Sequence, residues 1–319
     1  MADLQTKVLT ADQCGVNRAA TILSAGGLVA FPTETVYGLG ADARNGHAVA
    51  SVYAAKGRPS FNPLIVHVAD LDTAKRYAGF NDLALSLAAE FWPGPLTLVL
   101  PLTKNHDLSE LVTAGLDSVA IRIPQHPVAQ ALLNAFNGPL AAPSANPSGR
   151  ISPTQAAHVI ADMNGKINAV LDGGNCTVGL ESTILKIEGS KVSLLRAGGV
   201  SVEQITNVLG QGIATSSDPK TPQSPGQLKS HYAPKAQVRL NVGAVKDHEV
   251  LLGFGPDCAD AALNLSPTGD LIEAAANLFS YLRKMDALAL DGIAISPIPM
   301  SGLGLAINDR LKRAAAPRP

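Results

Sequence analysis

Lys56-Gly57-Arg58-Pro59-Ser60-Phe61-Asn62-Pro63-Leu64 puts two cations and a side-chain amide into one short loop, directly before the apolar run Leu64 to Val68. Glycine and proline redirect or restrict the backbone there. Cations fixed on a loop above a rigid scaffold suit a bound polyanion. The alternative is an ordinary basic surface loop, and the segments around it decide between the two.

On both sides of this loop, segments with the hydrophobic periodicity of a helix alternate with apolar runs of strand length. We predict strands at 27–31, 64–68, 96–100, 119–123, 169–172, 182–187 and 192–196, and helices at 47–56, 83–91, 126–136 and 201–209. Ser152-Pro153-Thr154 has the composition of a helix start, with Ser152 as the capping residue. The pattern predicts a mixed α/β domain over residues 1–210.

A segment without large apolar residues, 215–226, follows this domain and contains three prolines. We interpret residues 211–234 as a semi-extended linker. Beyond it, strands are expected at 237–240, 250–254 and 292–295 and helices at 270–287 and 305–314, which predicts a smaller Rossmann-like α/β domain over 235–319.

Composition, net charge and cysteine spacing disfavour several classes of protein. Hydrophobic residues make up 46% of the 319-residue chain and aromatic residues only 4%, which disfavours aromatic base-stacking platforms. The net charge of −1 argues against bulk nucleic-acid binding by a basic face. Cys14, Cys176 and Cys258 are too far apart for a zinc or disulfide pattern, so a reducing cytoplasm is expected. We expect no signal peptide and no membrane span.

Polar segments lie at the ends of several of the predicted strands. They include Pro32 to Gly40, Ala141 to Arg150, Glu181 to Ile184 and Leu194 to Gly198. Polar groups at many strand ends are what a site assembled across a sheet requires. Gly38 to Ala43 also matches a dinucleotide-binding GxGxxA pattern, but the segment is not at a strand-to-helix turn and Arg58 stands near the position of the expected acid.

Two further segments carry candidate binding residues. Arg122 lies within Val119 to Ile123, where it points opposite to its isoleucine neighbours; it either faces solvent or is interior with an anionic partner. His231 and Tyr232 follow the linker and form either a simple turn into the next domain or part of a lid that closes over a nucleotide. The chain has no GxxxxGK[ST], GxSxG or HExxH motif.

Six segments together resemble the YrdC-like threonylcarbamoyl-AMP synthases and occur in the order of that family. They are Pro32 to Gly40, Lys56 to Leu64, Trp92-Pro93-Gly94-Pro95, Val119 to Pro124, Ala142 to Asn146 and Glu181-Ser182-Thr183. Ser224-Pro225-Gly226, His231 to Pro234 and Gly302 to Arg310 look like the longer, two-domain branch. The resemblance covers nearly the whole chain.

The resemblance implies a twisted mixed sheet with helices and a concave basic face, followed by the Rossmann-like domain. It implies a nucleotidyltransferase that converts L-threonine, bicarbonate and ATP to threonylcarbamoyl-AMP and pyrophosphate, for a downstream transferase complex that modifies tRNA. We expect Mg²⁺ to accompany ATP on phosphate oxygens and water, without a protein-built metal site. The alternatives are a double-stranded-RNA-binding module that uses the same cleft, and a carbamoyltransferase related to hydrogenase maturation.

Family positions can be carried over residue by residue. The resemblance places Lys56 and Arg58 in catalysis, with Lys56 toward the phosphates or the carbonate-derived group, and Gly57 stands where many relatives have a bulkier residue. Its expected threonine-site residues are Thr35, His67, Arg122, Ala142 and Ser182. Its expected ATP-site residues are Arg58, Asn62, Ser118, Ser144, Asn146, Ser152, Arg196, His231 and Tyr232. In the tail, Arg310, Lys312, Arg313 and Arg318 either touch tRNA or partner proteins or are solvated.

Overall fold

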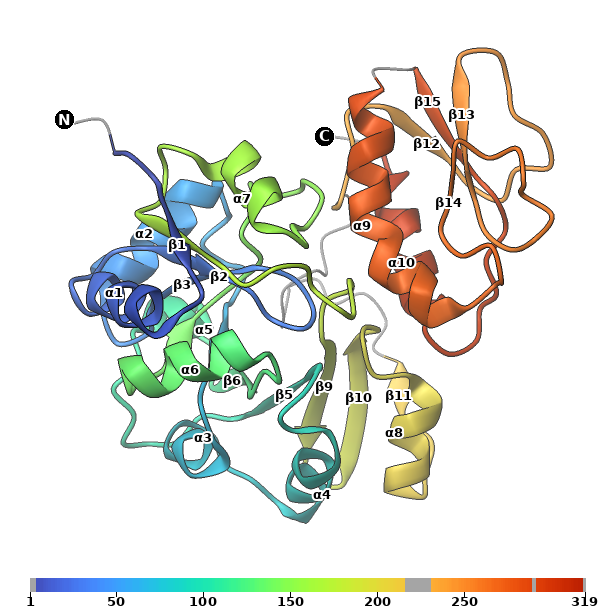
Figure 1. The fold of residues 1–319 in the computed structure, drawn as a ribbon. Coiled ribbons are helices and arrows are strands. Elements are labelled where there is room, and N and C mark those ends of the chain that lie inside the picture. The colour runs from blue at the N-terminus through green and yellow to red at the C-terminus, as the bar shows by residue number, and fades with distance from the viewer. Residues whose placement is uncertain (1–3, 216–230, 289–290, 318–319) are drawn as a thin grey trace.

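A computed structural model describes residues 4–215, 231–288 and 291–317, and it contains two sheets, one from residues before the predicted linker in the sequence and one from residues after it (Figure 1). The larger sheet has eleven strands in the order β1-β8-β2-β3-β7-β4-β6-β5-β9-β10-β11. The sheet contains parallel pairs such as β4 with β6 and antiparallel pairs such as β5 with β6, so it is mixed as predicted. Its strands are β1 (Lys7–Thr10), β2 (Val29–Phe31), β3 (Gly38–Asp42), β4 (Ile65–His67), β5 (Leu96–Pro101), β6 (Ser118–Arg122), β7 (Leu140–Ala141), β8 (Ala169–Asp172), β9 (Thr183–Glu188), β10 (Lys191–Arg196) and β11 (Ala214–Thr215).

Helices cover the two faces of this sheet unequally. One face carries the main core, formed with α2 (Gly46–Lys56), α3 (Leu71–Tyr77), α4 (Asp82–Phe91), α5 (Glu110–Thr113), α7 (Ala156–Met163) and α8 (Val202–Leu209). The other face packs against α1 (Gln13–Ser24) and α6 (Pro127–Phe136) beside β1, β8 and β2. Further along that second face, the described residues form a small apolar cluster, made of Ile65, Val99, Ala120, Ile184 and Leu195. This part of the sheet is where the candidate site forms.

The smaller sheet has the order β12-β15-β13-β14 and is parallel throughout, which confirms the Rossmann-like layering. Its elements are β12 (Gln237–Arg239), β13 (Glu249–Gly253), β14 (Leu263–Asn264), β15 (Gly292–Ile295), α9 (Leu271–Ala287) and α10 (Gly304–Ala314). The predicted boundaries 1–210, 211–234 and 235–319 stay a prediction, and most of the predicted linker, residues 216–230, lies outside the described residues.

Local chemistry explains most helix limits. Asn45 caps α2 by accepting from the backbone N–H groups of His47 and Ala48, and Gly57, with φ of 59°, ends the helix in the left-handed conformation. The predicted helix start at Ser152 is wrong. α7 begins at Ala156, because the Ser152 hydroxyl donates to a carboxylate of Glu181 at 2.6 Å instead of capping a helix.

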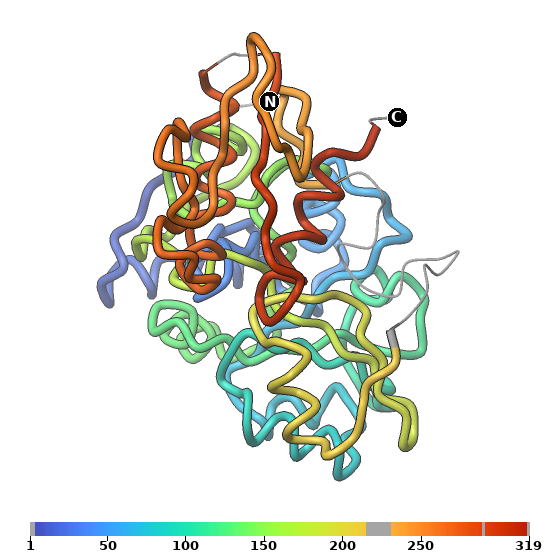
Figure 2. The backbone as a smooth tube through the Cα atoms, turned by 90° about the vertical axis from the view of Figure 1, so that its right-hand side faces the viewer, coloured from blue at the N-terminus to red at the C-terminus, as the bar shows by residue number. Residues whose placement is uncertain are grey.

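The two units pack directly against each other, as both views show (Figure 2). Val36, Ile151 and Leu180 of the large unit share one apolar cluster with residues of α9 and α10. Gly179 has φ of 74°, and a Cβ built there would lie 2.4 Å from the carbonyl oxygen of Ala275. This close approach admits only glycine, so the sequence itself is adapted to the contact between the units. None of the described helices is long and apolar enough to cross a membrane.

Candidate functional site

A cavity that is partly open to solvent lies where the ends of several strands meet the C-terminal unit. Its lining residues come from eight segments of the chain: Thr33, Thr35, Val36, Gly38, Arg58, Ile65, His67, Arg122, Ala142, Pro143, Ser144, Glu181, Ser182, Arg196, His231 and Tyr232.

His67 and Arg122 reach the cavity from neighbouring strands. β4 and β6 are parallel and pair His67 directly with Arg122. Ile65 lies two residues before His67, and alternate residues share a face, so both side chains point to the thinly covered face of the sheet. His67 is 3% exposed, and burial, aided by the nearby positive charge of Arg122, lowers its pKa to about 3. His67 is therefore neutral at physiological pH.

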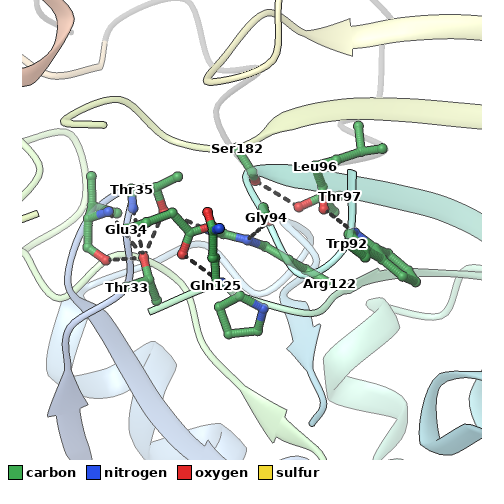
Figure 3. Close-up of polar contacts among 12 residues, drawn as sticks. Thr33, Glu34, Thr35, Trp92, Gly94, Leu96, Thr97, Arg122, Gln125 and Ser182 are labelled. Atoms are coloured by element: carbon green, nitrogen blue, oxygen red, sulfur yellow. Dashed lines mark hydrogen bonds and ion pairs between the residues drawn. The ribbon is translucent and has the colours of Figure 1, made fainter. Parts of the chain in front are cut away.

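Arg122 is interior and has an anionic partner, so the alternative of a solvent-facing arginine is wrong. Its Nη2 donates to Glu34 at 2.6 Å, its Nη1 donates to the Thr35 hydroxyl at 2.9 Å, and its Nε donates to the Gly94 carbonyl at 3.1 Å (Figure 3). A guanidinium carries five N–H groups. These bonds use one N–H group on each of the three nitrogens. One N–H group therefore remains on each of the two terminal nitrogens for a bound anion. A carboxylate fits that fork.

Small hydroxyls surround this guanidinium. The Thr33 and Thr35 hydroxyls are 2.7 Å apart, and Thr33 donates to the Val36 carbonyl. On the other side, the Ser182 hydroxyl lies 2.7 Å from that of Thr97 (Figure 3). Ala142, which also lines the cavity, is 4% exposed. The wall around Arg122 thus combines one fixed cation with hydroxyls and a small apolar surface, a combination that suits a small hydroxylated amino acid.

Arg58 and Arg196 bring two more cations to the same cavity. Arg58 donates to the backbone carbonyls of Asn62 at 3.1 Å and Pro63 at 2.8 Å. Arg196 donates to the Ser182 carbonyl at 2.9 Å and 3.1 Å and to its hydroxyl at 3.1 Å. Burial lowers the pKa of both guanidinium groups, which nevertheless stay protonated at neutral pH. The carbonyl partners of Arg58 carry no negative charge, so its charge stays available to a ligand.

Lys56 lies beside the cavity and is not among the residues that line it. It is 4% exposed, which contradicts the basic surface loop. Its ammonium donates to the carbonyls of Ser144, at 2.5 Å, and Asn146. Burial and then the charge of Arg58 lower its pKa well below the usual value. In the structure Lys56 therefore holds the backbone of the 144–146 loop, and its expected catalytic role stays a prediction.

Glu181 joins the two units at the edge of the cavity. Its carboxylate accepts from the Ser152 hydroxyl at 2.6 Å and from Nε of Arg310, on α10, at 2.8 Å. Burial raises the pKa of Glu181, but the charges of Arg310 and Arg196 and the bond from Ser152 outweigh it and bring the pKa to about 2. Arg310 is 0% exposed, so the expectation that it is solvated or touches tRNA is wrong.

His231 and Tyr232 also line the cavity, and both are buried. The Tyr232 ring stacks on Phe279 of α9, with ring centroids 5.4 Å apart, and lies 5.3 Å from the Arg310 guanidinium carbon. Burial lowers the pKa of His231 to about 3. Whether these residues belong to a lid depends on residues 216–230, which lie outside the described residues.

The structure brings most of the predicted site residues together but places some elsewhere. Ser118 is at the far end of β6, about 13 Å along the strand from Arg122 by the usual rise per residue. Asn62, Asn146 and Ser152 lie near the cavity but do not line it. The side-chain oxygens of Asn62 and Asn146 are buried without a hydrogen-bond partner in the described part of the chain. The roles carried over to these residues stay predictions.

Four polar residues at the site were not predicted as site residues: Thr33, Glu34, Glu181 and Arg310. The signal for the two glutamates was available, because a buried arginine needs an anionic partner and both lie in polar loops that the sequence singled out. No local signal identified Arg310.

The dinucleotide pattern at 38–43 is excluded, because Gly38–Asp42 forms strand β3. Within the described ranges, no group of three or more His, Cys, Asp or Glu side chains is placed to hold a metal ion.

Comparisons with known proteins agree over nearly the whole chain. A model of the Sua5–YciO–YrdC family, described as telomere recombination, matches residues 21–198, and a model described as the C-terminal domain of threonylcarbamoyl-AMP synthase matches residues 200–316. A threonylcarbamoyl-AMP synthase of Bacillus subtilis is 41% identical, covering 98% of this chain and 96% of the relative. One of Pyrococcus abyssi is also 41% identical, covering 94% of each. The crystal structure of P. abyssi Sua5 complexed with L-threonine superposes with a TM-score of 0.90 at 38% identity, covering 97% of this chain and 98% of that one.

Proposed function

We propose the reaction of this chain from one premise: it belongs to the Sua5–YciO–YrdC family and carries the C-terminal domain of threonylcarbamoyl-AMP synthases. Its activity is that of a threonylcarbamoyl-AMP synthase, the function for which its relatives are named. L-threonine, bicarbonate and ATP are condensed to threonylcarbamoyl-AMP and pyrophosphate. The product supplies the threonylcarbamoyl group for a modified adenosine in tRNA.

One observation carries this proposal: Arg58, Arg122 and Arg196 come from distant segments and line a single cavity. Three guanidinium groups that line one hollow make it suited to anionic ligands. The substrates supply them, as a carboxylate, a carbonate-derived group and a triphosphate. Each arginine is held in place by protein carbonyls, hydroxyls or a carboxylate, so the site is preorganised before the ligands bind.

The chemistry needs no protein nucleophile. The amine of threonine takes up bicarbonate with loss of water, or carbon dioxide with loss of a proton, and becomes an N-carboxylate. An oxygen of this carboxylate attacks the α-phosphorus of ATP, the bond to the bridging oxygen breaks, and pyrophosphate leaves. Two negatively charged groups must approach each other, so their repulsion is the barrier that the protein lowers. Fixed cations in a water-poor cavity do this through positioning and charge stabilisation.

The residues divide into two groups by their place in the cavity. We assign the threonine side to Arg122, Thr35, His67, Ala142 and Ser182, with the free N–H groups of Arg122 on the substrate carboxylate. We assign the nucleotide side to Arg58, Ser144, Arg196, His231 and Tyr232. Neutral His67 cannot add charge, so it contributes shape and a hydrogen bond. Ser182 touches Arg196, so it joins the two sides of the site.

Magnesium enters this proposal with the nucleotide. We propose that phosphate oxygens and water hold the ion, as is usual for Mg²⁺ with ATP. We also propose a cytoplasmic location, because Cys14, Cys176 and Cys258 are all free and the reaction consumes ATP. A transferase complex that acts on tRNA would consume the product.

The decisive experiment is incubation of the protein with ATP, L-threonine and bicarbonate in the absence of RNA, followed by mass detection of the adenylate and assay of pyrophosphate. We expect pyrophosphate release that requires threonine and bicarbonate. A chain that binds double-stranded RNA but releases no pyrophosphate under these conditions would have the alternative function instead. Omission of threonine serves as the matched control for ATP hydrolysis.

A further inference from the structure

Two short oxygen–oxygen contacts in the 33–36 segment fix the direction of the hydrogen bonds beside Arg122 (Figure 3). The Thr33 hydroxyl donates to the Val36 carbonyl at 2.7 Å, and the hydroxyl oxygens of Thr33 and Thr35 also lie 2.7 Å apart. Contacts of this length have a hydrogen between the two oxygens. A hydroxyl carries one hydrogen and a carbonyl carries none. Thr33 uses its hydrogen on Val36, so the hydrogen between the two threonines comes from Thr35.

The Thr35 hydroxyl is thereby left as an acceptor toward the cavity. Its hydrogen points to Thr33, and one of its two lone pairs accepts from Nη1 of Arg122 at 2.9 Å. No donor from the described residues occupies the second lone pair, and Thr35 lines the cavity. Both threonines are at most 2% exposed, so bulk water does not compete for their bonds.

Thr33 also lines the cavity, but its hydroxyl is fully engaged within the segment. Besides its contacts with Val36 and the Thr35 hydroxyl, its oxygen accepts from the backbone N–H groups of Thr35 and Val36, both at 3.2 Å. A hydroxyl has one hydrogen and two lone pairs, so nothing remains on Thr33 for a ligand. Thr33 therefore acts through Thr35.

An acceptor next to the Arg122 fork decides which ligand group can approach it. A carboxylate oxygen carries only lone pairs, so Thr35 repels it and leaves it to the N–H groups of Arg122. An amine or ammonium N–H can donate to Thr35. An amino acid has both groups on one carbon atom, so a fork of donors with an acceptor beside it matches them.

We infer that Thr33 is a positioning residue of the amino-acid site, which turns the Thr35 hydroxyl so that its second lone pair binds the amine of the substrate. The inference rests on the proposed function, in which Arg122 and Thr35 lie on the threonine side. It specifies how that side recognises its substrate, with the carboxylate on Arg122 and the nitrogen on Thr35. Arg122 and Glu34 form a pair without net charge, so a zwitterionic amino acid adds no net charge to this part of the site.

The nitrogen bound by Thr35 is the atom that reacts. It keeps one hydrogen after it has become an N-carboxylate, so the bond to Thr35 holds both the amine and the product of that step. Thr35 gives its own hydrogen to Thr33 throughout, and neither threonine transfers a proton.

The test measures the affinity for L-threonine by ligand-observed NMR titration, which also covers weak binding. Valine has the shape of threonine without the hydroxyl, so in Thr33→Val the Thr35 hydrogen loses its acceptor and turns toward the cavity. We expect Kd for L-threonine to rise about tenfold or more, as for a polar contact left unmade in a buried site. Thr33→Ser keeps the hydroxyl and should bind within about threefold of wild type.

Thr6→Val is the matched control. The Thr6 hydroxyl donates to the Ile167 carbonyl at 2.7 Å and accepts from the Gly165 N–H at 2.9 Å, which are the kinds of bond that Thr33 makes to its own backbone neighbours. Thr6 does not line the cavity, so Kd for L-threonine should stay within about threefold of wild type. Equal affinities in Thr33→Val and Thr6→Val would overturn the inference.

Two analogues of threonine separate a lost amine contact from a distorted segment. L-2-Aminobutyrate lacks only the hydroxyl, and (R)-3-hydroxybutyrate lacks only the amine. We expect Thr33→Val to weaken L-2-aminobutyrate about tenfold or more and (R)-3-hydroxybutyrate less than about threefold. An equal loss for the two analogues would mean that the segment is distorted, and a loss confined to (R)-3-hydroxybutyrate would place the substrate hydroxyl on Thr35. Either result would refute the inference.

The binding measurements separate this inference from the proposed reaction. A wild type that binds L-threonine but makes no adenylate would remove the proposed function, and the affinities of the variants would still decide the role of Thr33. A wild type that makes the adenylate while Thr33→Val binds L-threonine as tightly as wild type would overturn the inference alone. A wild type without affinity for L-threonine would overturn both.

Discussion

Two buried arginine–glutamate pairs in this molecule have similar geometry and different positions relative to the cavity. Arg122 meets Glu34 at 2.6 Å and Arg310 meets Glu181 at 2.8 Å, and all four side chains are at most 7% exposed. Arg122 lines the cavity and keeps N–H groups for an anion, whereas Arg310 lies outside the lining, and the carboxylate of its pair faces the cavity instead. In the first pair the arginine lines the cavity, and in the second pair the glutamate does.

Burial alone therefore does not identify a substrate-binding arginine. The two pairs differ in which partner lines the cavity, which is Arg122 in one pair and Glu181 in the other. Arg122 and Glu34 both belong to the large unit, so their contact forms when that unit folds. Arg310 and Glu181 belong to different units, so their contact forms only when the units pack together. Mutations should separate these two cases, first by activity and then by stability.

The largest effect is expected for Arg122→Ala. The variant loses the fork that binds the threonine carboxylate, so threonine-dependent pyrophosphate release should fall to background. Circular dichroism checks that the protein is folded, and Arg44→Ala, which breaks a partly exposed pair with Asp42, is the control. Arg122→Lys keeps the charge without the bidentate geometry and should remain at least about 100-fold impaired. Undiminished turnover in either Arg122 variant would remove Arg122 from the site.

Arg58→Ala should have the next largest effect and extends the comparison to an arginine whose hydrogen-bond partners among the described residues are backbone carbonyls. Loss of one preorganised cation should cost about 2–4 kcal/mol of transition-state stabilisation, by analogy with lost oxyanion-hole donors. The measurement is kcat/KM for ATP from pyrophosphate release. Arg150→Ala, an exposed arginine in the loop that follows Ser144 to Asn146, is the matched control. A decrease of less than threefold for Arg58→Ala would show that the 56–64 loop is peripheral.

Acid should destabilise the protein through His67, the neighbour of Arg122. Its pKa is about 3 when folded and 6.5 in an unfolded chain, so below pH 6.5 only the unfolded state takes up the proton. The free energy of unfolding should then fall by about 1.4 kcal/mol per pH unit for this residue as pH decreases from 6.5 toward 3.

Urea unfolding at pH 7 and pH 5 measures this effect. His67→Gln should lose less stability over that range than the wild type, and His47→Gln, at an exposed position, should lose as much. The same pH dependence in His67→Gln and wild type would show that His67 is not held neutral by burial.

The smallest effect is expected for Arg283→Gln, which weakens the contact between units away from the cavity. The Arg283–Asp162 side chains are 16% and 22% exposed, so the loss should be about 1 kcal/mol of unfolding free energy. Chemical denaturation measures it, and turnover should stay at the wild-type level. A large loss of activity would mean that any weakening of the contact between the two units disturbs the site. The position of an arginine–glutamate pair relative to the cavity would then matter less than expected.

Much of the architecture was predictable because its signals are local. Periodicity located α2, α6 and α9 within a residue or two, and Ser201 forms the capping box that starts α8. α1 and β1 were not predicted. The helix start at Ser152 was wrong because its hydroxyl has a distant partner, Glu181, which no local pattern reveals.

The sequence by itself determined the alternation of strands and helices, the two-sheet organisation and the set of ordered motifs that marks the family. These follow from spacing and from residue chemistry within a few positions along the chain. Only the tertiary structure decided that Lys56 binds backbone carbonyls, that Glu34 neutralises Arg122 across 88 positions and that Arg310 reaches Glu181 across 129. A buried charge must find a partner, but which one it finds depends on strand order and on the packing of the two units, and neither is written in the local sequence.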